Sequence, residues 1–248
     1  MKRSVCLVMT IILCLMVFMP VSVYAETYHL GGTDISIQVD DSSWYVFTRD
    51  NIKDNPELDE LEISYDTIHD ILYNNKAYMD ALLLQDGGEY VELFVRKKPL
   101  DTVIGNLSNY KDSEVQKFAK ELAAKYDDIT YSVYKNTYKF AKLEYIDQGY
   151  YLCEFVTVVN KDNYTLTFQS TSPYTDEEYT QIMNIVDSVR FDVDTSIKEP
   201  ITFNVVEATI HGAIIGGIVG LVVAIIKKKK KKSSKTDNVA VAGNAESE

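Results

Sequence analysis

Residues Tyr164 to Asp192 read YTLTFQSTSPYTDEEYTQIMNIVDSVRFD, and this stretch carries the clearest structural pattern in the chain. Its first part alternates apolar and polar side chains, with a polar residue after each apolar one. That period of two predicts a β-strand with one buried face and one wet face. The apolar positions are Tyr164, Leu166 and Phe168, and the polar positions are Thr165, Thr167 and Gln169.

The second part of the stretch predicts a helix. Thr175 and Glu178 have the three-residue spacing of a capping box, in which each side chain satisfies a backbone N–H of the other. An apolar stripe at helical spacing follows, and Phe191 closes the domain. The stripe consists of Tyr179, Ile182, Ile185, Val186 and Val189.

Further strands and two more helices are expected upstream, a short helix that Asp66 can cap and a longer one that begins at Ser113. The strongest hairpin signal is Asp86-Gly87-Gly88 between two apolar runs, because glycine accepts positive φ angles. The hairpins enforce antiparallel pairing, so the predicted fold class is α+β: an antiparallel sheet with helices packed on it. Strands are expected at 26–41, 44–48, 78–84, 89–97, 129–134, 138–145 and 150–159, and a helix carries Val115, Phe118, Ala119, Leu122 and Tyr126.

The N-terminus is typical of a secretory signal peptide covering residues 1–25. Lys2 and Arg3 form a charged segment, and an apolar run follows from Val5 to Met19. Small residues at the end of the segment predict cleavage after Ala25. We therefore expect the domain at 26–193 to be extracytoplasmic.

A second apolar segment, TIHGAIIGGIVGLVVAII at 209–226, contains no charged residue. Its 18 residues would span roughly 27 Å as a helix, which is close to the thickness of the bilayer core. We expect a single transmembrane helix, preceded by a stalk at 194–208 and followed by a cytosolic tail at 227–248. Six lysines mark the cytosolic membrane surface: Lys227, Lys228, Lys229, Lys230, Lys231 and Lys232.

Small residues recur every four positions along this expected helix. Gly212, Gly216, Gly220 and Ala224 would lie on one stripe and let a second helix approach closely. The stripe predicts self-association as a homodimer or docking of another membrane protein.

The charge of the chain follows the expected topology. Residues 26–207 carry 34 acidic and 16 basic side chains, a net charge of −18, within a chain whose total is −12. Nucleic-acid binding requires basic surfaces, so the sequence argues against a nucleic-acid partner.

Catalytic and metal-binding patterns are absent from the sequence. His29 and His69 lie in separate segments, and Cys153 is the sole cysteine after the expected cleavage. The acidic segment 54–62 lacks the spacing of an EF-hand loop, and whether it binds a cation stays open. We expect no catalytic residues, no cofactor and no metal site. The many tyrosines either line a glycan- or peptide-binding face or simply cover half-exposed strands.

The order of elements resembles the PsbP-like superfamily, which includes the photosystem II extrinsic subunit P and Ran-binding relatives. The resemblance is carried by Trp44 in DSSWYVFTRD after a first strand, by the serine-proline loop, and by the exit IVDSVRF. It implies an α/β/α sandwich without enzymatic activity that serves as a binding or assembly module. The photosystem and Ran-binding roles do not transfer to this exported domain.

These observations predict a single-pass membrane protein whose extracytoplasmic domain binds an envelope ligand without catalysis. Two alternatives remain open. One is an envelope hydrolase that uses paired carboxylates, and the other is a structural subunit of a membrane complex.

Overall fold

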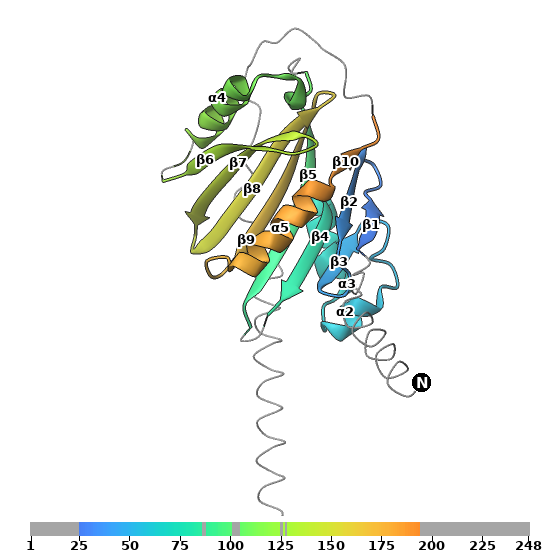
Figure 1. The fold of residues 1–248 in the computed structure, drawn as a ribbon. Helices are drawn as coiled ribbons and strands as arrows, with labels where there is room; N and C mark the ends of the chain where they lie inside the picture. The colour runs from blue at the N-terminus through green and yellow to red at the C-terminus, as the bar shows by residue number, and fades with distance from the viewer. Residues whose placement is uncertain (1–24, 86–87, 101–104, 125, 127, 194–248) are drawn as a thin grey trace, which may run out of the picture.

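The computed structural model describes residues 25–85, 88–100, 105–124, 126 and 128–193, which form two antiparallel sheets with helices packed on them (Figure 1). The large sheet has the strand order β3-β4-β5-β9-β8-β7-β6, and the small sheet has the order β1-β2-β10. The strands are β1 (Glu26–His29), β2 (Ile35–Val39), β3 (Trp44–Thr48), β4 (Ala77–Leu84), β5 (Tyr90–Pro99), β6 (Thr130–Lys135), β7 (Lys139–Asp147), β8 (Tyr150–Val159), β9 (Asp162–Ser170) and β10 (Arg190–Phe191).

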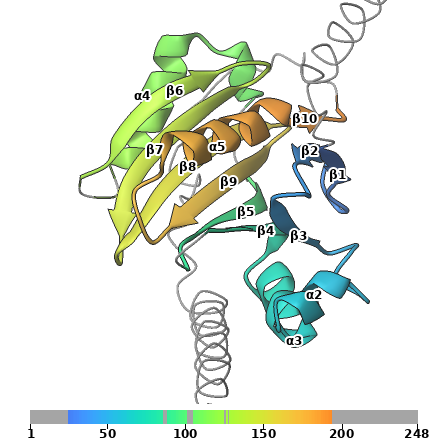
Figure 2. The same ribbon diagram turned by 60° about the horizontal axis from the view of Figure 1, so that its bottom comes forward.

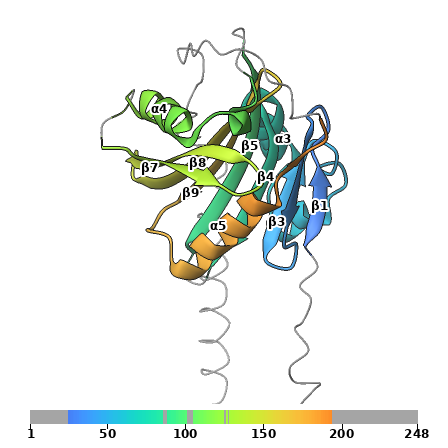
Figure 3. The same ribbon diagram turned by 45° about the horizontal axis from the view of Figure 1, so that its top comes forward.

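Helices cover both faces of the large sheet, and Figure 3 shows α4 and α5 on opposite sides of it. Helix α5 and the small sheet pack on one face, while α4 and the α3 region pack on the other. The α+β class with antiparallel sheets therefore agrees with the sequence prediction. The helices are α2 (Pro56–Glu60), α3 (Tyr65–His69), the π-helical turn η1 (Asp70–Asn74), the 3₁₀ turn η2 (Leu107–Asn109), α4 (Asp112–Ala123) and α5 (Asp176–Ser188).

Helix α5 confirms the predicted capping box. The Thr175 side chain accepts a hydrogen bond from the Glu178 N–H, and the Glu178 carboxylate accepts one from the Thr175 N–H. Ile182 and Val186 then face the core and are at most 2 % exposed. In α4 the apolar stripe is also buried as predicted, except that Tyr126 lies beyond the helix and is 38 % exposed.

The prediction of one strand across residues 26–41 was wrong, because the segment folds into a hairpin. Strands β1 and β2 pair antiparallel, with Glu26 opposite Val39. Gly32 has a φ of +80°, which allows the tight turn that a continuous strand would not contain. This hairpin, with β10 beside β2, forms the separate small sheet (Figure 2).

The prediction that β9 has one wet face was also wrong. Thr165, Thr167 and Gln169 are at most 1 % exposed, as fully buried as the apolar residues between them. Strand β9 lies in the middle of the large sheet between β5 and β8, so both of its faces are inside the protein.

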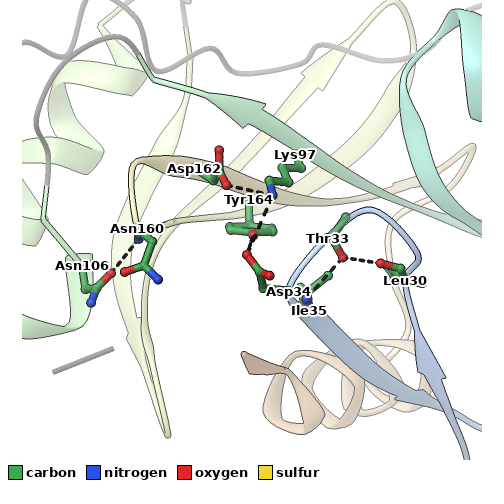
Figure 4. A network of polar contacts seen from close by, with 9 residues as sticks. All are labelled: Leu30, Thr33, Asp34, Ile35, Lys97, Asn106, Asn160, Asp162 and Tyr164. Atoms are coloured by element: carbon green, nitrogen blue, oxygen red, sulfur yellow. Dashed lines mark hydrogen bonds and ion pairs between the residues drawn. The ribbon is translucent and has the colours of Figure 1, made fainter. Parts of the chain in front are cut away.

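A polar network ties the small sheet to the start of β9 (Figure 4). The Lys97 ammonium lies 2.8 Å from Asp162 and 3.9 Å from Asp34 of the β1–β2 turn. The Tyr164 hydroxyl donates to Asp34 over 3.5 Å. These contacts fix the turn before β2 against the end of the β5–β9 pair.

None of the helices within the described residues is both long enough and apolar enough to cross a membrane. The expected stalk 194–208, membrane span 209–226 and tail 227–248 lie outside the described residues, as do residues 1–24 of the expected signal peptide 1–25.

Candidate functional site

Strand β6 forms one edge of the large sheet, and it is shorter than its neighbour β7. Strand β6 pairs with β7 only as far as Thr130 opposite Glu144. Strand β8 continues to pair on the other side, up to Asp147 opposite Tyr150. Tyr145, Ile146 and Asp147 therefore have no second strand beside them among the described residues.

An open groove of about 750 Å³ lies at this edge, and aromatic side chains from several segments converge on it. We call it the tyrosine groove. It is lined by Asp128, Glu144, Tyr145, Ile146, Tyr151, Leu152, Pro173, Tyr174 and Tyr179. Of the exposed large apolar side chains in the described residues, Ile146 has the largest exposed fraction, 62 %.

Hydrogen bonds hold two of the tyrosine rings in place. The Tyr174 hydroxyl lies 2.9 Å from the carbonyl oxygen of Tyr151 and 2.8 Å from that of Phe168. The Tyr179 hydroxyl accepts a hydrogen bond from the Lys142 ammonium. Because these hydroxyls are engaged, the rings can offer their faces to a ligand.

An ammonium group of the protein itself, that of Lys142, lies beside the Glu144 carboxylate that lines the groove. The Lys142 nitrogen lies 2.9 Å from a Glu144 oxygen and 4.9 Å from the centre of the Tyr179 ring. Burial lowers the pKa of Lys142, but the hydrogen bonds to Tyr179 and Glu144 outweigh it, so the net change is upward. The site thus stabilises positive charge.

Two further grooves flank α5 but have a different character. One of about 620 Å³ includes Gln85 and Glu177, and one of about 350 Å³ includes Trp44 and Asn184. Polar side chains dominate the first, and of these three grooves the tyrosine groove alone brings together several aromatic rings.

A second unusual feature lies inside the protein, on the α4 side of the large sheet. We call it the buried polar row, and every member is at most 3 % exposed. It runs across the central strands, between the apolar cluster under α4 and the one under α3. Its members are Asp80, Glu92, Arg96, Glu154, Thr165, Thr167 and Gln169.

Only part of this row is satisfied by hydrogen bonds. Gln169 donates to Glu92 over 2.6 Å, and Thr167 donates to Glu154 over 2.9 Å. Both terminal nitrogens of Arg96 and both oxygens of Asp80 lack a hydrogen-bond partner within the described part of the chain.

Burial changes the acidity of these groups. It raises the pKa of Glu92 to about 7 and that of Glu154 to about 8. The pKa of Asp80 is raised well above its usual value by burial and by the neighbouring Glu92. The pKa of Arg96 falls to about 10, because burial disfavours its charge.

Asp80 and Glu92 form a carboxyl pair, which a hydrolase would require, but neither lines any of the three grooves. A substrate needs a cleft that reaches the acid and the base. The Asp80–Glu92 pair is therefore not reached by any of these three grooves.

The expected helix-packing residues Gly212, Gly216, Gly220 and Ala224 and the expected membrane-surface lysines 227–232 lie outside the described residues. The two histidines lie apart, as expected. His29 is exposed beside Asp192, and His69 stacks on Tyr73 at 4.4 Å. No group of three metal-ligating side chains occurs within the residues that the structure describes.

The acidic segment 54–62 is largely helix α2, and two of its carboxylates contact β3. Glu57 accepts a hydrogen bond from the Val46 N–H, and Glu60 accepts one from the Tyr45 hydroxyl. Cys153 is buried, and burial raises the pKa of its thiol, so it is a core residue.

No family model matches the chain, and a search of curated proteins finds no match. Four chains of solved structures match this chain. Among them is the solution structure of cyanobacterial PsbP (CyanoP) from Synechocystis sp. PCC 6803, at 10 % sequence identity and a TM-score of 0.38. The match covers 68 % of this chain and 93 % of that one. That protein bears the family name of the sequence resemblance, but a TM-score this low carries no argument about the family or the function of this chain.

Sequence reasoning identified tyrosines as a candidate binding surface but not which of them gather. Tyr145, Tyr151, Tyr174 and Tyr179 come from β7, β8, a loop and α5. Nothing local in the sequence indicates that these four segments meet. The only hint was the Ser172-Pro173-Tyr174 loop, whose proline restricts the backbone directly before the helix.

Proposed function

We propose that this chain is a single-pass, membrane-anchored binding module that acts outside the cytoplasm without catalysis. Its domain at 26–193 would be a PsbP-like α/β/α sandwich, held to the membrane by a helix at 209–226. The tyrosine groove would be its ligand site, and the ligand would be an envelope component.

The observation that carries this proposal is the groove itself. Fixed aromatic rings, an exposed isoleucine and two carboxylates surround one open space, and such concave aromatic sites are typical of ligand recognition. The carboxyl groups whose pKa values are raised by burial, Asp80, Glu92 and Glu154, line none of the three grooves, which supports a role without catalysis.

Site-specific cross-linking in intact cells tests both the binding site and the side of the membrane on which it lies. We expect an Ile146→Cys variant to react with a membrane-impermeant bifunctional thiol reagent and to capture a specific envelope component. Cys153 is buried and should not compete. A Tyr73→Cys variant is the matched control, because Tyr73 is also exposed, at 44 %, but lies in η1.

Capture at Ile146 should be lost when Tyr151 is also changed to alanine, and should not occur at Tyr73. Equal capture at both positions, or no labelling of Ile146→Cys from outside the cell, would contradict the proposal.

The envelope hydrolase remains the alternative that the Asp80–Glu92 pair favours. Specific turnover by the purified full-length chain, abolished by Glu92→Gln, would replace the binding module with that function. The third reading, a structural subunit, requires that complex formation survive deletion of residues 26–193.

A further inference from the structure

We propose that the outer edge of β6 pairs antiparallel with β6 of a second copy of this chain, so that the large sheets of the two copies join into one. This inference goes beyond the proposed function and does not depend on it. Three features of β6 carry it: its open backbone edge, the order of its side chains and the charges at its two ends.

Strand β6 forms an open edge of the large sheet, and Figure 1 shows it on the far side of that sheet from β3. It pairs with β7 on one side, from Thr130 opposite Glu144 to Lys135 opposite Lys139. On its other side, the described residues provide neither a strand nor a side-chain hydrogen bond to its backbone. Alternate residues of an edge strand direct their N–H and C=O groups outward, so β6 offers unpaired backbone groups to another strand.

The opposite edge of the large sheet is closed to such pairing. In β3, the Val46 N–H donates to Glu57 and the Val46 carbonyl accepts from Asn51. The Thr48 N–H donates to Asn51 as well. Four of the five residues of β3 are buried, whereas none of the six residues of β6 is. Because proteins cover the edges that are not meant to pair, the contrast singles out β6.

The sequence of β6 lacks the devices that keep edge strands apart. Thr130 to Tyr134 reads TYSVY, with no charge, proline or glycine, and β-branched and aromatic residues favour a strand. Strand β1, the edge of the small sheet, differs in both respects. It has only four residues and one of them is Glu26, and short length and charge both discourage edge pairing.

A second copy fits this edge because the strand is complementary to itself. A two-fold axis perpendicular to the sheet keeps the α4 side of both copies on one face, so residues of the same face lie opposite each other. With the axis at Ser132, Tyr131 of each copy lies opposite Val133 of the other. Thr130 lies opposite Tyr134. Aromatic and β-branched residues are favourable cross-strand neighbours, and no like charges meet.

The charges at the two ends of β6 also match. Lys135 and Lys139 share one carboxylate, that of Asp112, at 3.4 Å and 2.7 Å, so this end of the strand carries excess positive charge. Asp128, which is exposed, precedes the strand at its other end. Antiparallel pairing brings the Lys135 end of each copy beside the Asp128 end of the other. This attraction offsets the repulsion between two chains that are acidic overall.

Cysteine cross-linking of the full-length chain in membranes tests which edge pairs. Ser132→Cys places two thiols opposite each other at the axis, where the Cβ atoms of paired residues lie about 5 Å apart. A short bifunctional thiol reagent should therefore give a covalent dimer. Thr27→Cys is the matched control, because Thr27 is exposed on the edge strand β1, and its yield should be at least about fivefold lower. Cys153 is buried and should not react.

A charge exchange at the axis separates the interface from misfolding. Ser132→Lys and Ser132→Glu each place like charges opposite each other, so each should raise the Kd of self-association about fivefold. Sedimentation of the full-length chain in detergent gives these Kd values. An equimolar mixture of the two variants should recover the wild-type Kd, because the opposite charges then meet. Thr27→Lys should leave the Kd unchanged. The apolar segment 209–226 is identical in all variants, so the ratio of Kd values reports on β6.

Three results would overturn the inference. They are a wild-type chain that stays monomeric in detergent, equal dimer yields from Ser132→Cys and Thr27→Cys, and a Kd that Ser132→Lys leaves unchanged or that the mixture does not recover. Capture of a different protein by Ser132→Cys, without a covalent dimer of this chain, would assign the β6 edge to that protein and exclude the second copy.

Discussion

Arg96 is the residue whose surroundings are least expected in a stable core. It is 3 % exposed, its guanidinium carbon lies 5.1 Å from the centre of the Phe94 ring, and its terminal nitrogens have no hydrogen-bond partner within the described residues. Its electrostatic neighbours are the carboxyl groups of Glu154, Asp80 and Glu92. Burying a guanidinium group without hydrogen-bond partners opposes folding. The stability of the protein therefore depends on whether the acids of the buried polar row are protonated.

We therefore expect the chain to become less stable as the pH rises from 5 to 9. Burial raises the pKa of Glu92 to about 7 and of Glu154 to about 8, both above the unfolded value of 4.5. An acid whose pKa is higher in the folded state contributes stability below its unfolded pKa and loses it as the pH passes the folded pKa. Urea unfolding at each pH should give a loss of several kcal/mol, because each unit of pKa difference corresponds to about 1.4 kcal/mol.

Glu154→Gln should flatten this pH dependence, because glutamine cannot ionise. Glu177→Gln, at an exposed position of α5, should keep the full slope. A stability that rises over this pH range, or equal slopes in both variants, would show that these acids are ionised in the folded protein.

At the scale of elements, the edge strand β3 of the large sheet differs from the end of β7, which extends beyond the shorter edge strand β6. Strand β3 is closed by side chains from the segment that follows it, whereas the end of β7 borders the tyrosine groove. The closing contacts of β3 are local, since Asn51 lies only three residues from Thr48. The edge protection is therefore built into the turn that follows the strand.

Asn51→Ala should destabilise the fold by about 2 kcal/mol, because two buried backbone groups lose their partner. The Asn51 amide accepts from the Thr48 N–H over 2.6 Å and donates to the Val46 carbonyl over 2.9 Å. Asn51→Asp keeps the acceptor and loses the donor, so its cost should be intermediate. Chemical denaturation gives the free energy of unfolding of the wild type, Asn51→Ala and Asn51→Asp. Equal stability of wild type and Asn51→Ala would mean that water replaces both bonds without cost.

At the scale of the whole molecule, the proposal joins an acidic binding domain to a membrane helix that associates through small residues. The residues concerned, Gly212, Gly216, Gly220 and Ala224, recur every four positions in the sequence. Close packing of backbones stabilises helix pairs in lipid, where the hydrophobic effect between helices is absent.

Replacing Gly216 and Gly220 with isoleucine should reduce self-association at least severalfold, because the larger side chains hold the two backbones apart. Cross-linking of the full-length chain in membranes measures this self-association. Ile214→Leu with Ile218→Leu is the control, since it changes the same helix without altering the stripe. Unchanged association, both with itself and with the partner captured at Ile146, would remove the stripe as a contact surface.

The sequence alone determined the elements whose signals are local. The capping box of Thr175 and Glu178 starts α5, and the glycine-containing turn after Gln85 joins β4 to β5. The apolar stripe of α4 is buried where its period requires. Each of these features depends on residues within a few positions of one another, so the pattern and its structural cause lie in the same stretch.

Only the tertiary structure decided which polar residues are buried and which tyrosines meet. Thr167 has the period of a wet strand face, yet it is buried because β9 lies between β5 and β8 and packing encloses both faces. Tyr151 and Tyr179 share a groove although one lies in β8 and the other in α5. An alternating pattern reports the two faces of a single strand, whereas burial and convergence depend on segments far away in the sequence that pack against it.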